Sequence, residues 1–441
     1  MLSGGEAYEG LSNAGEMGTN LIIVVNDNEM SIAENHGGLY QNLKELRDTE
    51  GRSSCNFFRS LGLDYLYVGE GNDIPSLIAA FAKVKDTSRP TVVHIHTQKG
   101  KGYAPAEADR EEFHWEMPFD LETGKPKVDC SGMEDYHSLT GKFLLEKMKE
   151  DHTVVAISSG TPTVIGFTPE RRKQAGRQFV DVGIAEEHAV ALASGIAAGG
   201  GRPVYGVYST FVQRCYDQLS QDLCINGNPA VITVFMGTVA GMNDVTHLGF
   251  FDIPLISNIP NMVYLAPTCS EEYFAMLEWA VRQTEYPVAI RVPGAAVVHR
   301  KEEFDTDYSE LNRYKMTARG ETVAILALGS FYDLGQALKN KLREESGVEA
   351  TLINPRYITG LDEPMLEELK VGHRIVVTLE DGVLDGGFGE KIARYYGNSE
   401  MRVLNYGLRK EFADRYNLDE LMKANRLTDK QMAEDIAGIL G

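Results

Sequence analysis

The sequence predicts an α/β fold made of three consecutive α/β domains with mainly parallel sheets. Short apolar runs rich in β-branched residues alternate with stretches of helical periodicity, which is the pattern of parallel βαβ units. The chain has 441 residues, 43% of them hydrophobic, which is enough for roughly three domains of ~150 residues each. Neither a short-period repeat nor a low-complexity tract interrupts this pattern.

The first predicted domain spans residues 1–119. Its opening stretch "GGEAYEGLSNAG" has helical periodicity, and the apolar run at residues 21–25 is typical of a strand covered on both faces of a parallel sheet. A further helix is expected at "IPSLIAAFAKVK" and a further strand at "PTVVHIHT". The long segment around "ENHGGLY" is expected to be a loop.

Two more α/β domains are expected after a linker. The polar, turn-rich run "DLETGKPKVDCSG" at residues 120–132 is the expected linker. The second domain, residues 133–298, has strand patterns at "TVVAIS", "RPVYGVY", "AVITVF" and "MVYLAP". The third domain, residues 310–441, has strand patterns at "TVAILALG", "EATLINP" and "RIVVTLED".

The net charge and the spacing of the cysteines argue against several classes of protein. A formal net charge of −21 argues against nucleic acid or an anionic membrane surface as partner, since both reward clustered Lys and Arg. No apolar run is long enough for a membrane span, and the first residues lack the pattern of a signal peptide. The cysteines show no C-x-x-C spacing, so neither a zinc site nor a disulfide framework is indicated. We therefore expect an acidic cytoplasmic protein. The cysteines are Cys55, Cys130, Cys215, Cys224 and Cys269.

A polar triplet follows the first predicted strand, in the stretch "LIIVVNDNEMSI". Asn26, Asp27 and Asn28 come directly after the apolar run, without an intervening glycine or proline. Ligands of open α/β sheets bind at the carboxyl ends of the strands, and amide and carboxylate oxygens there suit a hard cation and its phosphate. The alternative is an Asx-rich turn with no ligand.

The stretch "DVGIAEEHAVALASGIAAGG" carries the acids of the second domain. A short strand is followed by Glu186, Glu187 and His188 and then by a helix of small residues. A carboxyl group shielded by apolar neighbours has a raised proton affinity, as a general acid at neutral pH requires. The alternative is an exposed pair of glutamates that stabilises the start of the helix.

Aromatic residues follow in "YSTFVQRCYDQ". Tyr208, Phe211 and Arg214 could form an aromatic platform with a cation, or they could belong to a helix that faces the core.

The glycine-flanked loop "GMNDVTHLGFFD" follows a strand and contains Asn243, Asp244, Thr246 and His247. His247 could move a proton or bind a substrate, although a single histidine in a loop is more often only solvated.

Two weaker signals are present. His94 and His96 share one face of a strand, a spacing that two metal ligands could use, but no third ligand is near in the sequence. The run "DGGFGE" at residues 385–390 is expected to be a tight turn into a helix, and one glycine cluster is weak evidence for a phosphate site.

Taken together, these segments resemble the 1-deoxy-D-xylulose-5-phosphate synthase family of the transketolase superfamily. The resemblance runs nearly end to end and implies a transketolase-like fold with a diphosphate-binding, a pyrimidine-binding and a carboxyl-terminal domain. It also implies thiamine diphosphate and Mg²⁺ as cofactors and a homodimer. The motifs that carry it are "GGEAYEGLSNAG", "NDNEMSIAEN", "KGKGYAPAEADREEFH", "DVGIAEEHAV", "YSTFVQRCYDQ", "THLGFFD", "PNMVYLAP", "INPRYI" and "DGGFGE".

The resemblance assigns roles to the polar residues. In the family Mg²⁺ is held by an aspartate of a GDG motif, by the second asparagine of "NDN", here Asn28, and by a backbone carbonyl, here that of Met30. Glu186 matches the glutamate that hydrogen-bonds N1′ of the aminopyrimidine of the cofactor.

Further residues match positions that touch cofactor or substrate. Phe211 matches the ring that packs on the pyrimidine, and Tyr208 and Arg214 match residues that line the substrate channel. His247 and His114 match histidines that contact the donor or the acceptor sugar.

The sequence also departs from the family pattern. The GDG aspartate and about the first quarter of a typical member have no counterpart, so we expect weak metal binding. Asn243 replaces an aspartate and is kept as a candidate substrate ligand. Family arginines that bind the acceptor's phosphate fall at Met236 and Gly294, although Arg291 or Arg214 could reach that phosphate instead.

Three functions are compatible with these observations. The first is a carboligase that decarboxylates pyruvate and joins the two-carbon unit to glyceraldehyde 3-phosphate, for isoprenoid precursors. The second is a transketolase-like ketol transferase with another donor or an unphosphorylated acceptor. The third is an inactive fragment, or a subunit that needs a partner chain. In the first two, the partners are a small keto acid and an aldehyde.

Overall fold

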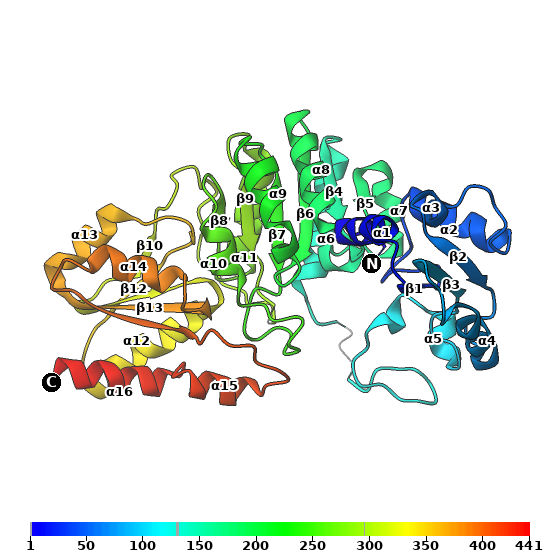
Figure 1. Cartoon of the computed structure of the whole chain (residues 1–441). Coiled ribbons are helices and arrows are strands. Elements are labelled where there is room, and N and C mark those ends of the chain that lie inside the picture. The colour runs from blue at the N-terminus through cyan, green and yellow to red at the C-terminus, as the bar shows by residue number, and fades with distance from the viewer. Residues whose placement is uncertain (1, 129–131, 295) are drawn as a thin grey trace. The chain divides into compact units, whose positions relative to one another are not determined.

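The computed structural model describes residues 2–128, 132–294 and 296–441. Cys130 and part of the expected linker, at residues 129–131, lie outside the described residues. The strands of the described residues form three sheets, of three, six and five strands. Most of these strands are labelled in Figure 1. The predicted α/β class with mainly parallel sheets is confirmed. Among the described helices, none has the length and apolar character needed to cross a bilayer.

The chain divides into two compact units, which are described separately. The first comprises residues 1–133 together with Ser158–Pro162 and Asp181–Glu187. The second comprises Glu134–Ile157, Thr163–Val180 and His188–Gly441. The boundaries of three domains at residues 119, 133, 298 and 310 therefore stay a prediction.

The three-stranded sheet of the first unit has the order β1-β3-β2, with both pairings parallel. Successive residues of β3 point to opposite faces: Val92 packs in one apolar cluster with helices α1 to α3, and Val93 in another with α4. Helices therefore cover both faces. The elements are α1 (Gly5–Met17), β1 (Ile22–Asp27), α2 (Gly38–Asp48), α3 (Phe57–Ser60), β2 (Asp64–Val68), α4 (Ile74–Val84), β3 (Thr91–His96), α5 (Ala104–Ala108) and η1 (Glu112–His114).

The first strand extends two residues beyond its predicted end. Asn26 and Asp27 belong to β1 and pair with Ile95 and His96 of β3. Backbone pairing therefore continues past the apolar run, and the polar side chains stand on the last two residues of the strand.

The six-stranded sheet has the order β5-β4-β6-β7-β9-β8. Its central strand β7 is buried along its whole length, as its uninterrupted apolar sequence predicts. The strands are β4 (Val154–Ser158), β5 (Phe179–Asp181), β6 (Arg202–Tyr208), β7 (Val231–Phe235), β8 (Val263–Leu265) and β9 (Val288–Arg291). The helices are α6 (Tyr136–Glu150), η2 (Pro162–Ile165), α7 (Pro169–Ala175), η3 (Gly176–Gln178), α8 (Glu186–Ala198), η4 (Val212–Cys215), α9 (Tyr216–Gln218), η5 (Leu219–Cys224), α10 (Asp252–Ser257) and α11 (Ser270–Arg282).

The five-stranded sheet has the order β10-β12-β11-β13-β14 and is parallel except for its edge strand β10. Helices α12 and α16 lie side by side against it (Figure 1). The strands are β10 (Lys315–Ala318), β11 (Thr322–Ala327), β12 (Thr351–Asn354), β13 (His373–Val383) and β14 (Arg402–Leu408). The helices are η6 (Gly329–Phe331), α12 (Tyr332–Ser346), α13 (Glu363–Gly372), α14 (Phe388–Tyr396), α15 (Leu418–Ala424) and α16 (Asp429–Leu440).

A buried ion pair joins the last two sheets within the second unit. Arg291, the last residue of β9, donates from Nε to Asp252 Oδ2 at 2.7 Å and from Nη2 to Asp252 Oδ1 at 3.2 Å. The same Nη2 donates to the backbone oxygen of Asp381 in β13 at 2.6 Å. Arg291 is only 3% exposed and Asp252 only 1%, so water cannot replace these contacts.

Asp252→Ala is expected to destabilise the second unit by about 3–5 kcal/mol, because it leaves the Arg291 guanidinium buried without its carboxylate. Denaturant unfolding of wild type and variant measures this difference. Glu368→Ala is the control, since it removes an exposed partner of Arg319 and should cost less than about 1 kcal/mol. Equal losses for the two variants would contradict a structural role for the buried pair.

Candidate active site

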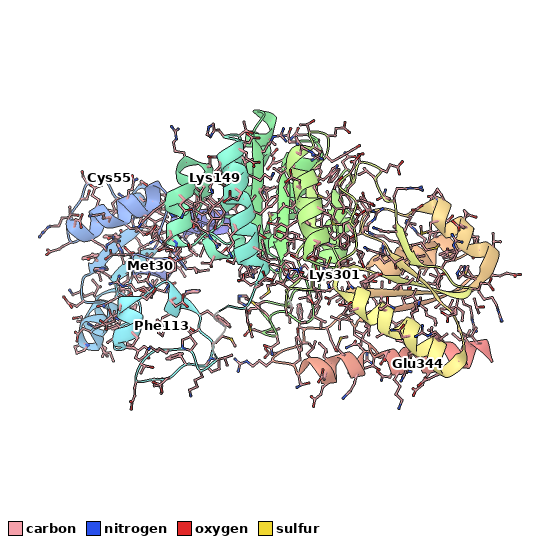
Figure 2. The ribbon with its side chains drawn as sticks, turned by 180° about the vertical axis from the view of Figure 1, so that it is seen from behind. Met30, Cys55, Phe113, Lys149, Lys301 and Glu344 are labelled. Atoms are coloured by element: carbon pink, nitrogen blue, oxygen red, sulfur yellow. The ribbon has the colours of Figure 1, made fainter. Side chains whose placement is uncertain are left out.

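The polar triplet forms two successive turns at the end of β1. The Asp27 side chain accepts a hydrogen bond from the Glu29 backbone N–H at 3.1 Å, and the Asn28 side chain accepts one from the Met30 N–H at 3.1 Å. Between these turns Glu29 has a φ of +67°. Met30 lies in the loop that follows the strand (Figure 2). The alternative of an Asx-rich turn is therefore correct as local structure, and it leaves a ligand role open.

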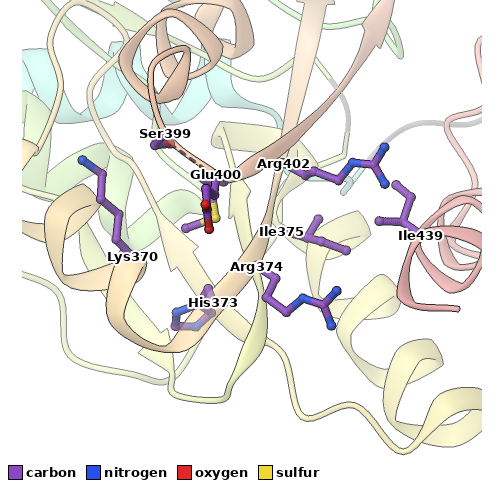
Figure 3. A pocket seen from close by; sticks show the side chains of 9 residues that line it. Lys370, His373, Arg374, Ile375, Ser399, Glu400, Arg402 and Ile439 are labelled. Atoms are coloured by element: carbon purple, nitrogen blue, oxygen red, sulfur yellow. Dashed lines mark hydrogen bonds between the residues drawn. The ribbon is translucent and has the colours of Figure 1, made fainter.

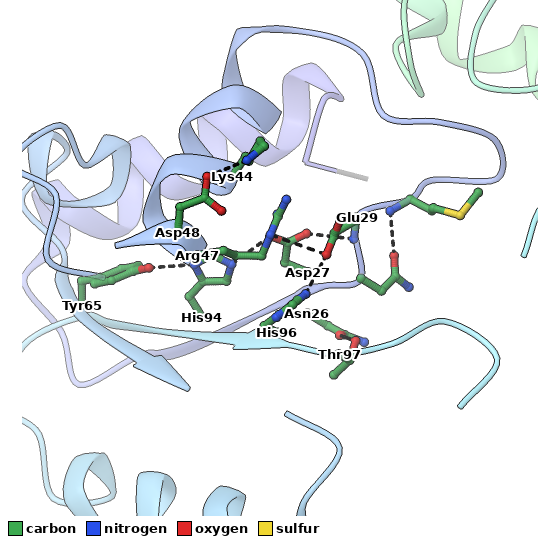
Figure 4. A network of polar contacts seen from close by, with 12 residues as sticks. Asn26, Asp27, Glu29, Lys44, Arg47, Asp48, Tyr65, His94, His96 and Thr97 are labelled. Carbon is green, nitrogen blue, oxygen red and sulfur yellow. Dashed lines mark hydrogen bonds and ion pairs between the residues drawn. The ribbon is translucent and has the colours of Figure 1, made fainter. Parts of the chain in front are cut away.

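Asp27 itself already accepts hydrogen bonds from two side chains. It is 4% exposed and accepts hydrogen bonds from Arg47 of α2 and His94 of β3 (Figure 4). Burial alone would raise the pKa of Asp27, but these hydrogen bonds lower it to about 2. Asp27 is therefore ionised, and both of its carboxylate oxygens already accept hydrogen bonds from the protein.

The same loop offers two oxygens to a divalent metal, those of the Asn28 side chain and the Met30 backbone. The Asn28 amide oxygen is half-buried and keeps a second lone pair, and the Met30 backbone supplies a carbonyl. The described residues contain no group of three His, Cys, Asp or Glu placed to bind an ion. Two neutral oxygens fit Mg²⁺ only where phosphate oxygens complete its shell and supply charge. The loop therefore fits a metal carried by a diphosphate.

The two histidines of β3 have separate protein partners. His94 contacts the Tyr65 hydroxyl at 2.7 Å through Nδ1 and Asp27 at 3.1 Å through Nε2, whereas His96 contacts Glu29 at 2.8 Å. Both ring nitrogens of His94 are used, so the spacing that suggested a pair of metal ligands serves hydrogen bonding instead.

Lys99 and His114 lie beside the same loop. Lys99 donates to the backbone oxygens of Ser31 and Ile32, both at 3.1 Å. Burial lowers the pKa of Lys99, and burial together with the nearby Lys99 charge lowers the pKa of His114. His114 is therefore neutral at neutral pH and able to accept a proton.

Glu186 is the first residue of α8 and is 3% exposed, whereas Glu187 is half-buried. The turn before it is fixed by Asp181, which accepts hydrogen bonds from Gly160 N at 2.9 Å and Gly183 N at 2.8 Å. These residues belong to the same compact unit as the β1 loop. The expected shielding of Glu186 is present, and its role stays a prediction.

Aromatic rings form a row in the second unit. Tyr208, at the end of β6, lies 5.8 Å from Phe211, and Phe211 lies 5.4 Å from His247 between ring centroids. Burial raises the pKa of Tyr208. Arg214 lies in η4, one turn beyond Phe211. The rings therefore lie in contact, and the part of Arg214 in an aromatic platform stays a prediction.

His137 extends this row and was not anticipated from the sequence. Its ring stacks on Phe235 at 4.8 Å and meets Tyr208 edge-on at 6.2 Å. Its Nδ1 must be the protonated nitrogen, because it faces the backbone oxygen of Val164 at 2.7 Å. Burial lowers the pKa of His137. A single histidine near the start of a helix carried no motif that could have identified it.

Asn243 and His247 occupy the loop after β7. The Asn243 side chain donates to the backbone oxygen of Tyr416 at 3.1 Å. The backbone oxygen of Asn243 accepts a hydrogen bond from the Arg415 N–H at 2.6 Å. His247 is hydrogen-bonded through Nδ1 to Thr246 at 2.8 Å. Asn243 thus anchors the loop to the carboxyl-terminal segment, and its role as a substrate ligand stays a prediction.

Of the two arginines named as alternative ligands of the acceptor's phosphate, Arg291 is held in place by the protein. Its guanidinium is held by Asp252 and Asp381 and is 3% exposed, so it cannot swing toward a ligand. Met236 follows β7 with a φ of +56°, and a Cβ placed on Gly294 would lie 2.7 Å from the Met236 sulfur. This corner is therefore filled by an apolar side chain.

In the turn "DGGFGE" the backbone N–H groups of residues 386–389 already have acceptors within the protein. Glu380 accepts hydrogen bonds from Phe388 N and Gly389 N, both at 2.8 Å, at the start of α14. Burial raises the pKa of Glu380 to about 7. A protein carboxyl group therefore occupies the place where a phosphate would bind.

A cavity of about 460 Å³ lies elsewhere, at the amino ends of β13 and β14. None of the predicted site residues lines it. Figure 3 shows Arg374 and Arg402 projecting on one side of it and Lys370 on the other.

Sequence models of three protein families match the chain. The model described as 1-deoxy-D-xylulose-5-phosphate synthase matches residues 1–56. The models described as transketolase, pyrimidine binding domain and transketolase, C-terminal domain match residues 134–297 and 313–432.

Curated relatives agree with these matches. A 1-deoxy-D-xylulose-5-phosphate synthase of Lachnoclostridium phytofermentans is 33% identical over 97% of this chain and 75% of that protein. One from Clostridium tetani is 33% identical over 100% of this chain and 76% of that protein.

Solved structures support the fold. One titled as a split gene transketolase, inactive beta4 tetramer, is 21% identical with a TM-score of 0.59, covering 68% of this chain and 96% of that one. A transketolase from Pichia stipitis in complex with sedoheptulose-7-phosphate is 15% identical with a TM-score of 0.58. The match covers 98% of this chain and 74% of that one.

The buried His137 is expected to make stability depend on pH. Its folded pKa lies below the ordinary 6.5, so the unfolded chain binds the proton more readily, and stability falls as pH drops below about 6.5. His137→Gln should reduce this loss, measured as the melting temperature from about pH 7.5 to about pH 5. His152→Gln changes an exposed histidine and is the control. Parallel pH profiles for wild type and His137→Gln would refute the assignment.

Proposed function

Because the chain belongs to the 1-deoxy-D-xylulose-5-phosphate synthase family, we propose that it is a thiamine-diphosphate-dependent carboligase. Its reaction decarboxylates pyruvate and joins the remaining two-carbon unit to an aldehyde, which feeds isoprenoid precursor synthesis. The observation that carries this proposal is the 33% identity over 97% of the chain to a curated synthase. The buried Glu186 and the loop after β1 are consistent with it.

The cofactor, when bound, supplies a carbon nucleophile that attacks the keto group of the donor. Asn28 Oδ1 and the Met30 carbonyl would hold its Mg²⁺, and Lys99 keeps the neighbouring loop in place through Ser31 and Ile32. Phe211 would pack on the pyrimidine ring. The chain thus contributes binding and orientation, and the charge for the metal comes mainly from the diphosphate.

Glu186 would hold the proton that activates the aminopyrimidine at N1′. Its carboxyl group is buried at the start of α8, so it is shielded from water and can form one persistent hydrogen bond. Glu187 is more exposed and is not placed in this role.

Two histidines would move protons near the substrate. His114 is kept neutral by burial and by Lys99, so it can accept a proton from a hydroxyl group. His247 is fixed by Thr246 beside the ring of Phe211. Tyr208 and Arg214 would line the substrate channel, and Asn243 would be a further substrate ligand.

A second candidate differs in the acceptor. In the corner formed by Met236 and Gly294 an apolar side chain fills the space, and Arg291 is locked in its ion pair. These contacts favour an unphosphorylated aldehyde, as in a transketolase-like ketol transfer, because a phosphate needs charged or N–H donors.

The proposed assembly is a homodimer, and the proposed location is the cytoplasm.

The direct test measures pyruvate decarboxylation and ketose formation by the purified chain with thiamine diphosphate, Mg²⁺ and an aldehyde. Product with either acceptor supports a carboligase. No product, with activity appearing only after a second polypeptide is added, would favour a subunit that needs a partner chain. Size-exclusion chromatography with light scattering tests the dimer.

Glu186→Ala is expected to slow C2 proton exchange of bound thiamine diphosphate by a factor on the order of 10² to 10⁴, because one positioned proton-transfer group is lost. NMR exchange measurements follow this rate directly. Glu187→Ala is the matched neighbour and should largely spare exchange. If both variants behave alike, the assignment of Glu186 to N1′ fails.

Met236→Arg combined with Gly294→Arg is expected to lower the KM for glyceraldehyde 3-phosphate more than it raises kcat, because the phosphate is remote from the reacting carbon. Two charge-assisted bonds of about 1.5–3 kcal/mol each correspond to a factor on the order of 10² to 10⁴ in binding.

The control for this pair is Gly294→Arg alone. It should give no gain, since the new side chain would meet the Met236 sulfur and the Thr238 methyl group. Steady-state kinetics with phosphorylated and unphosphorylated glyceraldehyde decide the question. A strong native preference for the phosphorylated aldehyde would disprove the second candidate.

A further inference from the structure

Glu29 stands in a conformation that L-residues rarely adopt. Its φ of +67° lies in the left-handed region, which costs free energy for a side chain with a Cβ. It separates Asn28 from Met30, the two residues whose oxygens would face the metal. Any relaxation of Glu29 would therefore turn one of these oxygens away from the other.

The Asp27 carboxylate compensates for this strain. Oδ1 accepts the Glu29 N–H at 3.1 Å, while Oδ2 accepts from Arg47 and, at 3.1 Å, from His94 Nε2. Asp27 is 4% exposed and His94 is fully buried. Three donors from the loop, α2 and β3 thus converge on one carboxylate.

The network extends across the whole first sheet. His94 is fixed in turn by the Tyr65 hydroxyl of β2 at 2.7 Å, so all three strands contribute a side chain (Figure 4). The Glu29 side chain also has partners: its Oε1 lies 2.8 Å from His96 Nε2 and 3.8 Å from Arg47 Nε.

We infer that Asp27 is a positioning residue: clamped by Arg47 and His94, it holds Glu29 in the left-handed conformation and so aims the Asn28 amide oxygen and the Met30 carbonyl before any ligand binds. The inference rests on the proposed function in assigning these two oxygens to a metal. Asp27 itself does not touch the metal, because its oxygens are already engaged.

Replacement by asparagine isolates the effect. An amide has one acceptor oxygen, and its NH₂ group can only donate, so Asn at this position cannot serve three donors. Whichever way the amide turns, either the Glu29 N–H or the Arg47 and His94 pair loses its acceptor. The shape of the side chain is almost unchanged.

The first measurement is hydrogen–deuterium exchange of peptides covering residues 26–34, without cofactor or metal. Asp27→Asn should accelerate exchange in this segment. The second measurement is the Kd for Mn²⁺ in the presence of thiamine diphosphate, followed by electron paramagnetic resonance. Asp27→Asn should raise this Kd by about tenfold, as is usual for partners that orient metal ligands.

A second substitution separates positioning from general damage. Glycine adopts a positive φ without a steric penalty, so Glu29→Gly added to Asp27→Asn should recover most of the lost affinity. Glu29→Ala removes the same carboxylate but keeps a Cβ, and should not recover it. Asp48→Asn, which changes an exposed carboxylate paired with Lys44, should leave both measurements unchanged.

Each outcome bears on the inference. Unchanged exchange in Asp27→Asn, or equal recovery by Gly and Ala at position 29, would overturn it. If Asp27→Asn does not fold, Arg47→Gln is tested in the same way and must show the same faster exchange. If the wild-type chain binds no Mn²⁺ with thiamine diphosphate, the proposed function fails, while the exchange experiment still decides whether Asp27 positions the loop.

Discussion

Parallel strand pairing is the constraint on which the positions of the candidate site residues depend. Parallel strands are buried on both faces, so polar side chains gather where the strands end. Asn28 follows β1, Tyr208 ends β6 and Met236 follows β7. Residues far apart in the sequence thus lie at strand ends, where backbone N–H and C=O groups are not used in hydrogen bonds between strands.

Buried ionisable side chains in or at the ends of strands hold the protein's own backbone. Asp27 at the end of β1 and Glu380 in β13 each accept backbone N–H groups of the turn that follows. Arg291 at the end of β9 donates to the backbone of β13. A buried charge is stable only when such partners satisfy it. These groups therefore fix the geometry of the loops that follow the strands.

The sequence pattern was sufficient for the strongest elements. The run "RPVYGVY" coincides with β6, and the burial of Glu186 agrees with the interpretation of its helix mouth. The strands β2, β9, β10 and β14 were not predicted, because each is short or mixes polar with apolar residues and is identified only by its partner strand. The His137 ring contacts and the Arg47 ion pair were missed for a related reason, since both depend on long-range contacts that no local motif encodes.

The contact between Met236 and Gly294 also constrains the order in which this corner can evolve. A Cβ at position 294 would lie 2.7 Å from the Met236 sulfur and 2.8 Å from the Thr238 methyl carbon. A larger residue at 294 is therefore accommodated only where the Met236 side chain and the Thr238 methyl group both move. The effect of a substitution at 294 thus depends on the residues at 236 and 238, so these positions are epistatic and a larger side chain at 294 requires coordinated changes.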